Sequence, residues 1–181
     1  REIHFAKNGE DAHVIAKMNS LLDKGIIEKL YEASQAGVKI ELIVRGICVL
    51  IPGIPGISDN ITVRSIVGRF LEHSRIFWFR NGGREELYIS SADWMPRNLN
   101  DRVELMVPIE DPEIKRRLKQ MVDIELSDNQ KAHIMQADGT WLKTISAENQ
   151  LCAQEYFQKI AEKRDAEDEM TLAQKLEPYT P

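Results

Sequence analysis

A histidine and an arginine stand two residues apart in the segment that leads into the apolar run at positions 76–79. His73 could act on phosphorus as a nucleophile or serve as a general acid, because the unperturbed pKa of imidazole lies near ~6.5. On a strand, Arg75 would project to the same side as His73 and place a fixed cation beside the imidazole. A lone histidine next to a strand is more often structural, so this pair needs support from other residues.

A second candidate is the segment Ser90-Ser91-Ala92-Asp93, where an apolar stretch gives way to hydroxyl groups and an acid. Serine hydroxyls and backbone N–H groups in such a turn can cradle an anion. The alternative is a strand followed by a capped turn with no ligand. Asn98, five residues beyond Asp93, is a further polar candidate in the same region.

A third candidate is Arg102 with Glu104, which we expect to alternate onto one face of a strand at residues 103–107. Such a pair is either a buried ion pair or an arginine that a carboxylate holds toward a ligand. Burial of the pair costs several kcal/mol in desolvation, which weakens a purely stabilising role.

The basic residues in the middle of the chain are all arginines. The guanidinium group has a planar fork of donors that binds phosphate at two points, which the lysine ammonium does not have. Salt bridges to nearby acids are the alternative, so position in the fold must decide. The arginines between residues 40 and 114 are Arg45, Arg64, Arg69, Arg75, Arg80, Arg84, Arg97 and Arg102.

The elements that would position these residues begin with a strand at residues 13–19. Ser20 and Asp23 then indicate a helix start, and Gly37 a helix end. Residues 38–44 alternate as a second strand, so the three elements form a βαβ unit with parallel strands. Ligands bind beyond the carboxyl ends of such strands. Asn19 and Arg45 stand at those ends, and Lys17 lies close by.

The rest of the chain predicts an α/β fold with a mixed, mostly parallel sheet flanked by helices. Asn81-Gly82-Gly83 indicates a hairpin turn, and Asp138-Gly139 indicates a second one. We expect strands at residues 61–66, 75–79, 86–89 and 103–107, and helices at residues 111–126 and 147–164.

Composition and charge predict one domain with short flanking segments. Of the 181 residues, 43% are hydrophobic, and the formal net charge is −5. The chain begins at Arg1, which we interpret as a cut from a longer protein, and residues 1–12 as the end of a linker from a preceding domain. Residues 13–164 form the domain, and residues 165–181 an acidic tail that is frayed or disordered.

The two cysteines are far apart and match neither a zinc site nor a disulfide framework. A reducing, cytoplasmic setting fits this cysteine usage. The acidic balance and the lack of a stripe of lysines and aromatic residues argue against nucleic acid as a partner.

The candidate residues resemble half of a phospholipase D-type site, which has the motif HxKxxxxD followed by G-S-x-N. His73 matches the histidine, and Arg75 stands at the lysine position. Residues 90–93 stand for G-S-x-N. Arg80, however, stands where the motif has its aspartate, which argues against a plain phospholipase activity.

A closer resemblance, over residues 13–145, is to the C-terminal catalytic domain of polyphosphate kinase (ATP:polyphosphate phosphotransferase), which has a phospholipase D-like fold. The matching segments occur in the order of that family and are long. They are Ile15-Ala16-Lys17-Met18-Asn19-Ser20-Leu21, residues 33–40, Ile43-Val44-Arg45-Gly46-Ile47-Cys48, Pro52-Gly53-Ile54-Pro55-Gly56, residues 64–75 and Ser90-Ser91-Ala92-Asp93-Trp94-Met95.

This resemblance implies an activity: reversible transfer of the terminal phosphate of ATP to polyphosphate, through a phosphohistidine, with Mg²⁺. The chain would be the second of two phospholipase D-like halves, without the phosphorylated histidine, and inactive alone. Its partners would be ATP or ADP, polyphosphate and the other domains of its own polypeptide, with the magnesium ligands outside this chain. The full-length enzyme would be a homo-oligomer, cytoplasmic or peripheral to the inner membrane.

The resemblance also implies roles for single residues. His73 matches the second catalytic histidine, which would face the phosphorylated one. Arg45 and Arg102 match phosphate-binding arginines, and Glu104 the acid beside them. Further candidates for lining the site or holding the arginines are Lys17, Asn19, Arg75, Asp93 and Asn98.

Two other functions remain open at this point. One is a phospholipase D-type diesterase or transferase half, which would need a carboxylate at position 80. The other is a non-catalytic module that binds polyphosphate without turning it over.

Overall fold

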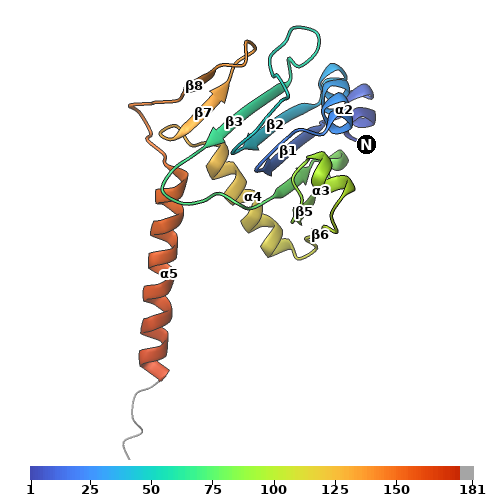
Figure 1. Cartoon of the computed structure of the whole chain (residues 1–181). Coiled ribbons are helices and arrows are strands. Elements are labelled where there is room, and N and C mark those ends of the chain that lie inside the picture. Colours follow the sequence, from blue (N-terminus) through green and yellow to red (C-terminus); the bar gives the residue numbers. More distant parts are fainter. Residues whose placement is uncertain (176–181) are drawn as a thin grey trace, which may run out of the picture.

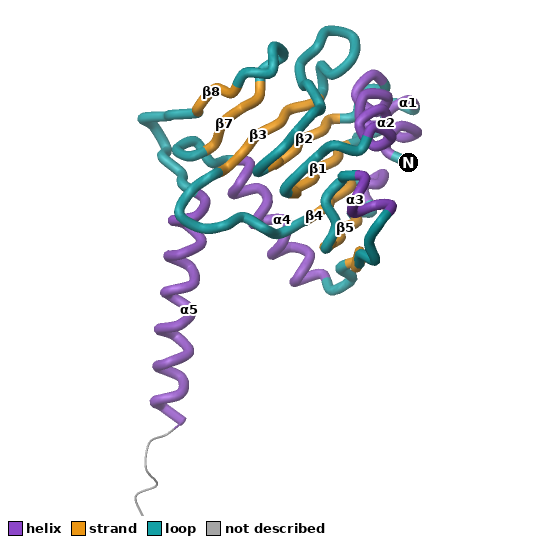
Figure 2. Tube along the Cα trace, in the orientation of Figure 1, coloured by secondary structure: helices purple, strands orange, loops and turns teal. Residues whose placement is uncertain are grey.

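The domain is built on one eight-stranded sheet with strand order β6-β5-β4-β1-β2-β3-β7-β8. The computed structural model describes residues 1–175, and the side chains of residues 1–165. Figures 1 and 2 show the sheet at the centre, helices on both of its faces, and α5 extending away from it. The strands are β1 (His13–Met18), β2 (Lys39–Val44), β3 (Ile61–Ile66), β4 (Ile76–Phe79), β5 (Glu86–Ser90), β6 (Met106–Pro108), β7 (Ala132–Met135) and β8 (Trp141–Lys143).

The βαβ unit predicted from the sequence is present. α2 (Lys24–Gln35) begins where the Asp23 carboxylate accepts a hydrogen bond from the Ile26 amide at 2.9 Å. It ends before Gly37, whose φ of +97° is a conformation that glycine adopts without strain. β1 and β2 then pair in parallel, and β2 pairs in parallel with β3.

Alternating residues of the central strands supply two separate cores. Val14, Ala16 and Met18 of β1 belong to the core that includes Leu30 of α2, together with Ile40 and Leu42 of β2. The opposite face of the sheet packs Ile15 and Ile43 against Val122 of α4 (Pro112–Leu126). The remaining helices are α1 (Glu2–Lys7), the short 3-10 turn η1 (Asn81–Gly83), α3 (Pro96–Asn100) and α5 (Ala153–Lys175).

The mixed α/β class is confirmed, but parallel pairing is confined to the three central strands. β4, β5, β6, β7 and β8 all join the sheet through antiparallel pairs. The prediction of a mostly parallel sheet therefore extends the βαβ pattern too far. Short connections such as η1 between β4 and β5 allow only antiparallel neighbours, because a parallel pair needs a long crossover.

Several boundaries differ from those expected. The last helix, predicted from residue 147, begins at Ala153. The predicted strand at 103–107 is reduced to β6, and residues 103–105 form a loop in which Val103 is 99% exposed. In the region expected to be a linker, the Glu2 carboxylate of α1 accepts hydrogen bonds from the amides of His13 and Asn81. α5 continues to Lys175, and the rest of the predicted acidic tail lies outside the described residues.

Candidate functional site

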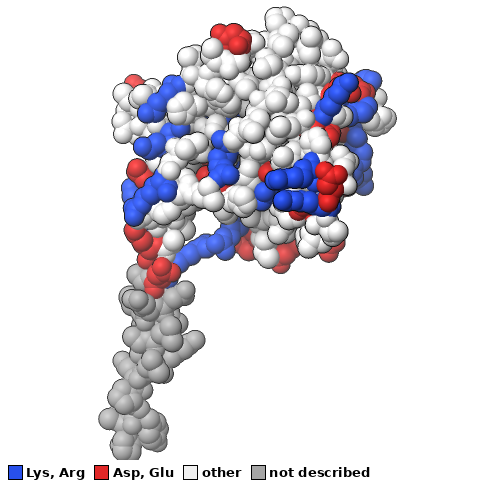
Figure 3. Space-filling model, viewed as in Figure 1, with Lys and Arg blue, Asp and Glu red and all other residues white. Residues whose placement is uncertain are grey.

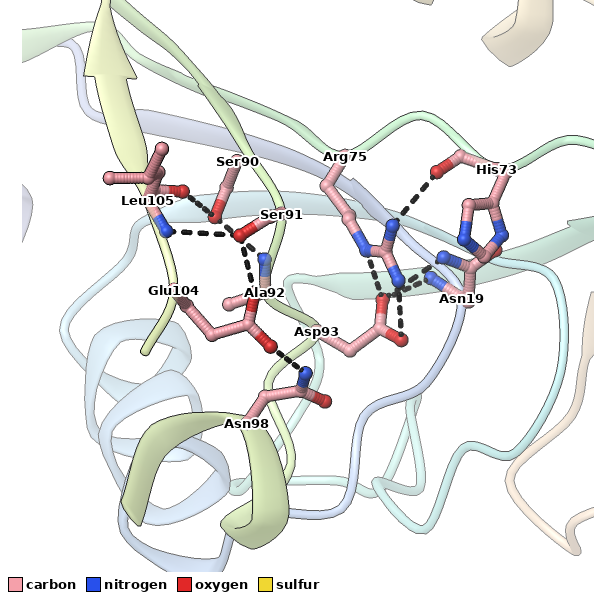
Figure 4. Close-up of polar contacts among 10 residues, drawn as sticks. All are labelled: Asn19, His73, Arg75, Ser90, Ser91, Ala92, Asp93, Asn98, Glu104 and Leu105. Atoms are coloured by element: carbon pink, nitrogen blue, oxygen red, sulfur yellow. Dashed lines mark hydrogen bonds and ion pairs between the residues drawn. The ribbon is translucent and has the colours of Figure 1, made fainter. Parts of the chain in front are cut away.

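Four chain segments meet at one edge of the sheet. β1 and β2 are parallel, so Asn19 and Arg45, which follow them, lie at the same edge. β4 runs antiparallel to β1 with Ile76 opposite Lys17, so the segment before β4, which contains His73 and Arg75, comes to this edge as well. β5 is antiparallel to β4 and brings Ser90 and the turn after it to the same place. Figure 4 shows Asn19, His73, Arg75 and Ser90 gathered there, with the turn after Ser90.

Asp93 is the centre of a buried hydrogen-bond network at this edge. Its carboxylate accepts from Arg75 Nε at 3.0 Å and from Arg75 Nη2 at 3.3 Å. It also accepts from the Asn19 backbone amide at 2.8 Å and from Asn19 Nδ2 at 3.2 Å. Burial by itself would raise the pKa of Asp93, but the hydrogen bonds from Arg75 and Asn19 lower it overall. The network therefore keeps the Asp93 carboxylate charged and fixes the orientation of the Arg75 guanidinium beneath the surface of the site.

His73 is exposed and lies in the loop before β4, not on a strand. Its backbone carbonyl accepts a hydrogen bond from Arg75 Nη1 at 3.2 Å. The expectation that Arg75 projects beside the imidazole from one face of a strand is therefore wrong, because residues 71–75 are irregular. The Arg75 guanidinium instead holds the backbone of His73 and is anchored by Asp93 (Figure 4).

Glu104 is held by polar side chains from two neighbouring segments. One of its oxygens accepts from Ser91 Oγ and the other from Asn98 Nδ2. These hydrogen bonds, that of Ser91 first, lower the pKa of Glu104. Ser91 Oγ also accepts from the Leu105 amide at 3.0 Å, so the turn after β5 and the loop before β6 are tied together.

Arg102 does not form the expected buried pair with Glu104. It is exposed in the loop before β6, and no salt bridge joins it to an acid among the residues with described side chains. The alternation on a strand face, on which that expectation depended, is absent because residues 101–105 are not in a strand. Arg102 is thus an exposed cation near the Glu104 carboxylate, whose pKa it helps to lower.

Arg45 lies beside an open groove at the end of β2. The groove has a volume of about 460 Å³ and is lined by Arg45, Gly46 and residues 66–71. Within the part of the chain whose side chains are described, no acid pairs with the Arg45 guanidinium. In the same region of the surface, basic side chains are spread around the ends of β1–β3 with acids among them (Figure 3). Arg45 therefore has donors free for an anion.

Lys17 does not line this surface. Its side chain is 4% exposed and its ammonium binds Glu72 Oε2 at 2.7 Å and Glu125 Oε1 on α4. The alternation of β1 explains this, because Lys17 shares its sheet face with Ile15, which packs on the α4 side. Burial raises the pKa of Glu125 to about 7 against the attraction of the Lys17 ammonium.

Ser90, a candidate from the sequence, ties the turn after β5 to the loop before β6, because its Oγ donates to the Leu105 carbonyl at 3.0 Å and accepts from the Ala92 amide. Three further residues that hold the site together were not predicted from the sequence: Glu72, Glu125 and Gln154. Glu72 and Glu125 bind Lys17, and Gln154 binds the segment before His73. A buried lysine on an apolar strand could have signalled that acids lie nearby. Nothing in the sequence around Gln154 signals its role, since its partners are 82 and 84 residues away.

The described residues do not suggest a metal site. Among them, no group of three or more histidine, cysteine, aspartate or glutamate side chains is placed to hold a metal ion.

Replacement of Glu125 by glutamine is expected to remove a pH-dependent contribution to stability. The folded pKa of about 7 lies above the ordinary value of 4.5, so the folded state keeps its proton to higher pH than the unfolded state. The contribution from Glu125 is fully present below pH 4.5 and is lost as pH rises through 7. The free energy of unfolding of Glu125→Gln, minus that of wild type, should therefore rise by on the order of 1–3 kcal/mol as pH increases from 4.5 to 7.

Urea denaturation at a series of pH values measures this difference. Glu155→Gln, at an exposed position on α5, is the matched control. Curves of unfolding free energy against pH that run parallel for wild type and Glu125→Gln would contradict the prediction. The groups that face Glu125 are Lys17 from β1, Glu72 from the loop before β4, and Arg64 from β3, which donates to the Glu125 carbonyl at 3.4 Å.

The open mixed sheet, with its polar residues at one edge, defines an α/β domain of the phospholipase D-like class. NucT from Helicobacter pylori shares this fold at a TM-score of 0.51, with 13% identity, over 69% of this chain and 84% of NucT. The crystal structure of polyphosphate kinase from Porphyromonas gingivalis is far more similar, with a TM-score of 0.86 and 43% identity. That match covers 91% of this chain and 26% of the other.

Sequence comparison gives the family. The family model "Polyphosphate kinase C-terminal domain 2" matches residues 1–154. Polyphosphate kinase of Thermosynechococcus vestitus is 59% identical over 141 residues, which are 78% of this chain and 19% of that protein. Polyphosphate kinase of Pseudomonas putida is 54% identical over 150 residues, which are 83% and 21%. The chain belongs to the polyphosphate kinase C-terminal domain family, and it spans about a fifth of the length of these curated relatives.

The described helices include none that is both long and apolar enough to cross a membrane.

Proposed function

We propose that this domain supplies the second half of the active site of a polyphosphate kinase, which reversibly transfers the γ-phosphate of ATP to polyphosphate. The observation that carries the proposal is the convergence of Arg45, His73 and the Asp93 network at one sheet edge, in a chain of this family. The phosphorylated histidine would come from the other half. Its imidazole nitrogen would attack the γ-phosphorus of ATP as the bond to the ADP oxygen breaks, and a terminal oxygen of polyphosphate would then take the phosphoryl group.

The residues of this chain would neutralise charge on the transferred phosphoryl group and exchange protons with it. Arg45 and Arg102 would neutralise negative charge on the transferred group, which is the main demand in phosphoryl transfer. His73 would face the phosphorylated histidine and exchange a proton with the phosphoryl oxygens or the leaving oxygen. Glu104, fixed by Ser91 and Asn98, would hold the loop that carries Arg102. Arg75, Asp93 and Asn19 would set the backbone of His73.

Exposed apolar side chains around the site are consistent with a missing half. They flank the polar edge in separate loops and have no apolar cover within the described chain. A complementary domain would bury them and exclude water from the reaction. They are Ile47, Val49, Val67, Leu71, Val103 and Leu105. The other domains of the polypeptide and a homo-oligomer of the full-length enzyme belong to the same proposal.

A diesterase of the phospholipase D type is less well supported. Arg80, which replaces the motif's carboxylate, forms ion pairs with Glu85 and Asp11. It follows β4 at the end of that strand opposite the site. It therefore cannot substitute for a carboxylate that acts on the histidine.

Calorimetric titration with inorganic polyphosphate of defined length tests whether this edge of the sheet binds polyphosphate. Binding should weaken with salt, and Arg45→Ala should raise Kd by about tenfold or more, because charge-assisted hydrogen bonds to phosphate are lost. Arg84→Ala is the charge-matched control, since Arg84 follows η1 at the opposite edge of the sheet. An equal effect of both variants would show nonspecific attraction and contradict the proposal. If the domain alone does not bind, the same pair of variants is compared in a polyphosphate kinase that carries it.

A further inference from the structure

The loop that carries His73 is irregular, yet buried side chains from two other elements, α5 and β1, hold it. The loop spans residues 67–75 between β3 and β4. Much of it faces solvent, with Val67 62% and Leu71 72% exposed. An exposed loop of this length is normally mobile, so contacts that restrain it determine where His73 lies.

Gln154, near the start of α5, forms the first restraint. Its Oε1 accepts from the Phe70 amide at 3.0 Å, and its Nε2 donates to the Phe70 carbonyl at 2.8 Å. Nε2 also donates to Glu72 Oε1 at 2.9 Å. Gln154 is only 5% exposed, so these hydrogen bonds are shielded from water. The side chain thus pairs with the loop backbone as a neighbouring strand would.

Lys17 forms the second restraint. Its ammonium binds Glu72 Oε2 at 2.7 Å, while Gln154 binds the other oxygen of the same carboxylate. Lys17 in turn binds Glu125 on α4. The residue directly before His73 is therefore fixed at both of its oxygens, from β1 and from α5.

Gly68 shows that the loop is fitted to Gln154. A Cβ at position 68 would clash with Gln154 Oε1 and lie 3.0 Å from its Cδ, so the Gln154 amide would have to shift. The backbone at Gly68 is not left-handed, so it is this close approach, and not backbone strain, that favours glycine there.

The side chains of Lys17 and Glu72 also pack close to Arg45. Arg45 lines a small internal cavity of about 10 Å³ together with Lys17, Glu72 and Glu125. Displacement of Glu72 would therefore alter the packing beneath Arg45 as well as the backbone of His73.

We propose that Gln154 and Lys17, through Glu72, form a clamp that positions the His73 loop for phosphoryl transfer, with α5 as an integral part of the active-site support. These are positioning residues, and the inference rests on the proposed function for the role of His73. A buried lysine with two carboxylates adds little net stability compared with apolar residues of similar volume. A positioning role gives this costly arrangement a function.

The test uses a full-length polyphosphate kinase that carries this domain. Gln154→Met keeps the side-chain volume and removes the hydrogen bonds, and Gly68→Ala disturbs the clamp from the loop side. Gln158→Met is the matched control, because Gln158 lies one turn along α5 and, among the residues with described side chains, hydrogen-bonds to the exposed Glu162 alone. Amide hydrogen exchange of residues 68–73 reports on the clamp without relying on activity, and steady-state kinetics report on positioning.

Both clamp variants should exchange these amides about five- to tenfold faster than wild type. Both should lower kcat by about 10- to 100-fold with little change in KM for ATP, because a misplaced group costs more in the transition state than in substrate binding. Gln158→Met should change neither quantity.

Unchanged exchange in both variants would overturn the clamp. Faster exchange with normal kcat, in an enzyme that His73→Ala inactivates, would overturn the positioning role. If His73→Ala leaves turnover normal, the proposed function of His73 fails instead, and the exchange data still decide whether the clamp exists.

Discussion

Arg45→Ala, in a polyphosphate kinase that carries this domain, is expected to lower kcat by about 100- to 1000-fold while the protein stays folded. Loss of one preorganised donor for developing charge has an effect of this size in other enzymes. Arg45 is only partly buried, lies beside the groove at the end of β2, and forms no ion pair with the acids whose side chains are described. Its removal would therefore take away the proposed phosphate contact and few structural ones.

The measurement is steady-state synthesis of polyphosphate from ATP, with thermal unfolding recorded for each variant. Arg84→Ala is the control for net charge and should keep wild-type turnover. Arg75→Ala is a useful contrast, because Arg75 is bound to Asp93 and its loss should lower both stability and activity. Near-normal turnover of Arg45→Ala would show that this arginine does not serve the transferred phosphate.

The chain of 181 residues by itself is expected to form no polyphosphate from ATP, which is a complete loss of synthesis activity relative to a full-length enzyme. The proposed reaction needs a second histidine to carry the phosphoryl group. In the described part of this chain, no other histidine joins the Asp93 network or lines the Arg45 groove: His4 and His13 lie toward the amino end of β1, and His133 of β7 pairs with Ser65 of β3. The nucleophile for the first transfer would therefore be missing.

Phosphorus NMR of the purified chain with ATP and Mg²⁺ measures this directly, and a full-length relative serves as the positive control. Circular dichroism with a cooperative thermal transition shows that the inactive chain is folded. Robust polyphosphate synthesis by the pure chain would refute the half-site proposal, and the nucleophile would then have to be sought among its own residues.

Local patterns in the sequence determined much of the fold. The βαβ unit, the start of α2 at Asp23 and the hairpin of β7 and β8 follow from hydrophobic periodicity, caps and turn residues that act over a few positions. The placement of Asn19 and Arg45 at one edge follows from the parallel pairing of β1 and β2. Residue type and spacing alone made His73, Arg102 and Glu104 candidates, and the family resemblance implied their particular roles.

Tertiary structure decided what those candidates contact. Lys17 lies on the α4 face of β1 with Ile15, and there its ammonium meets Glu125, 108 residues away, whereas Asn19 lies beyond the end of the strand and binds Asp93. Arg75 binds Asp93 and does not lie free beside the imidazole of His73. Gln154 reaches Phe70 across 84 residues. A buried polar group needs a hydrogen-bond partner, and that partner is often distant in the sequence. Sequence periodicity predicts which face of an element is buried but does not predict such distant partners.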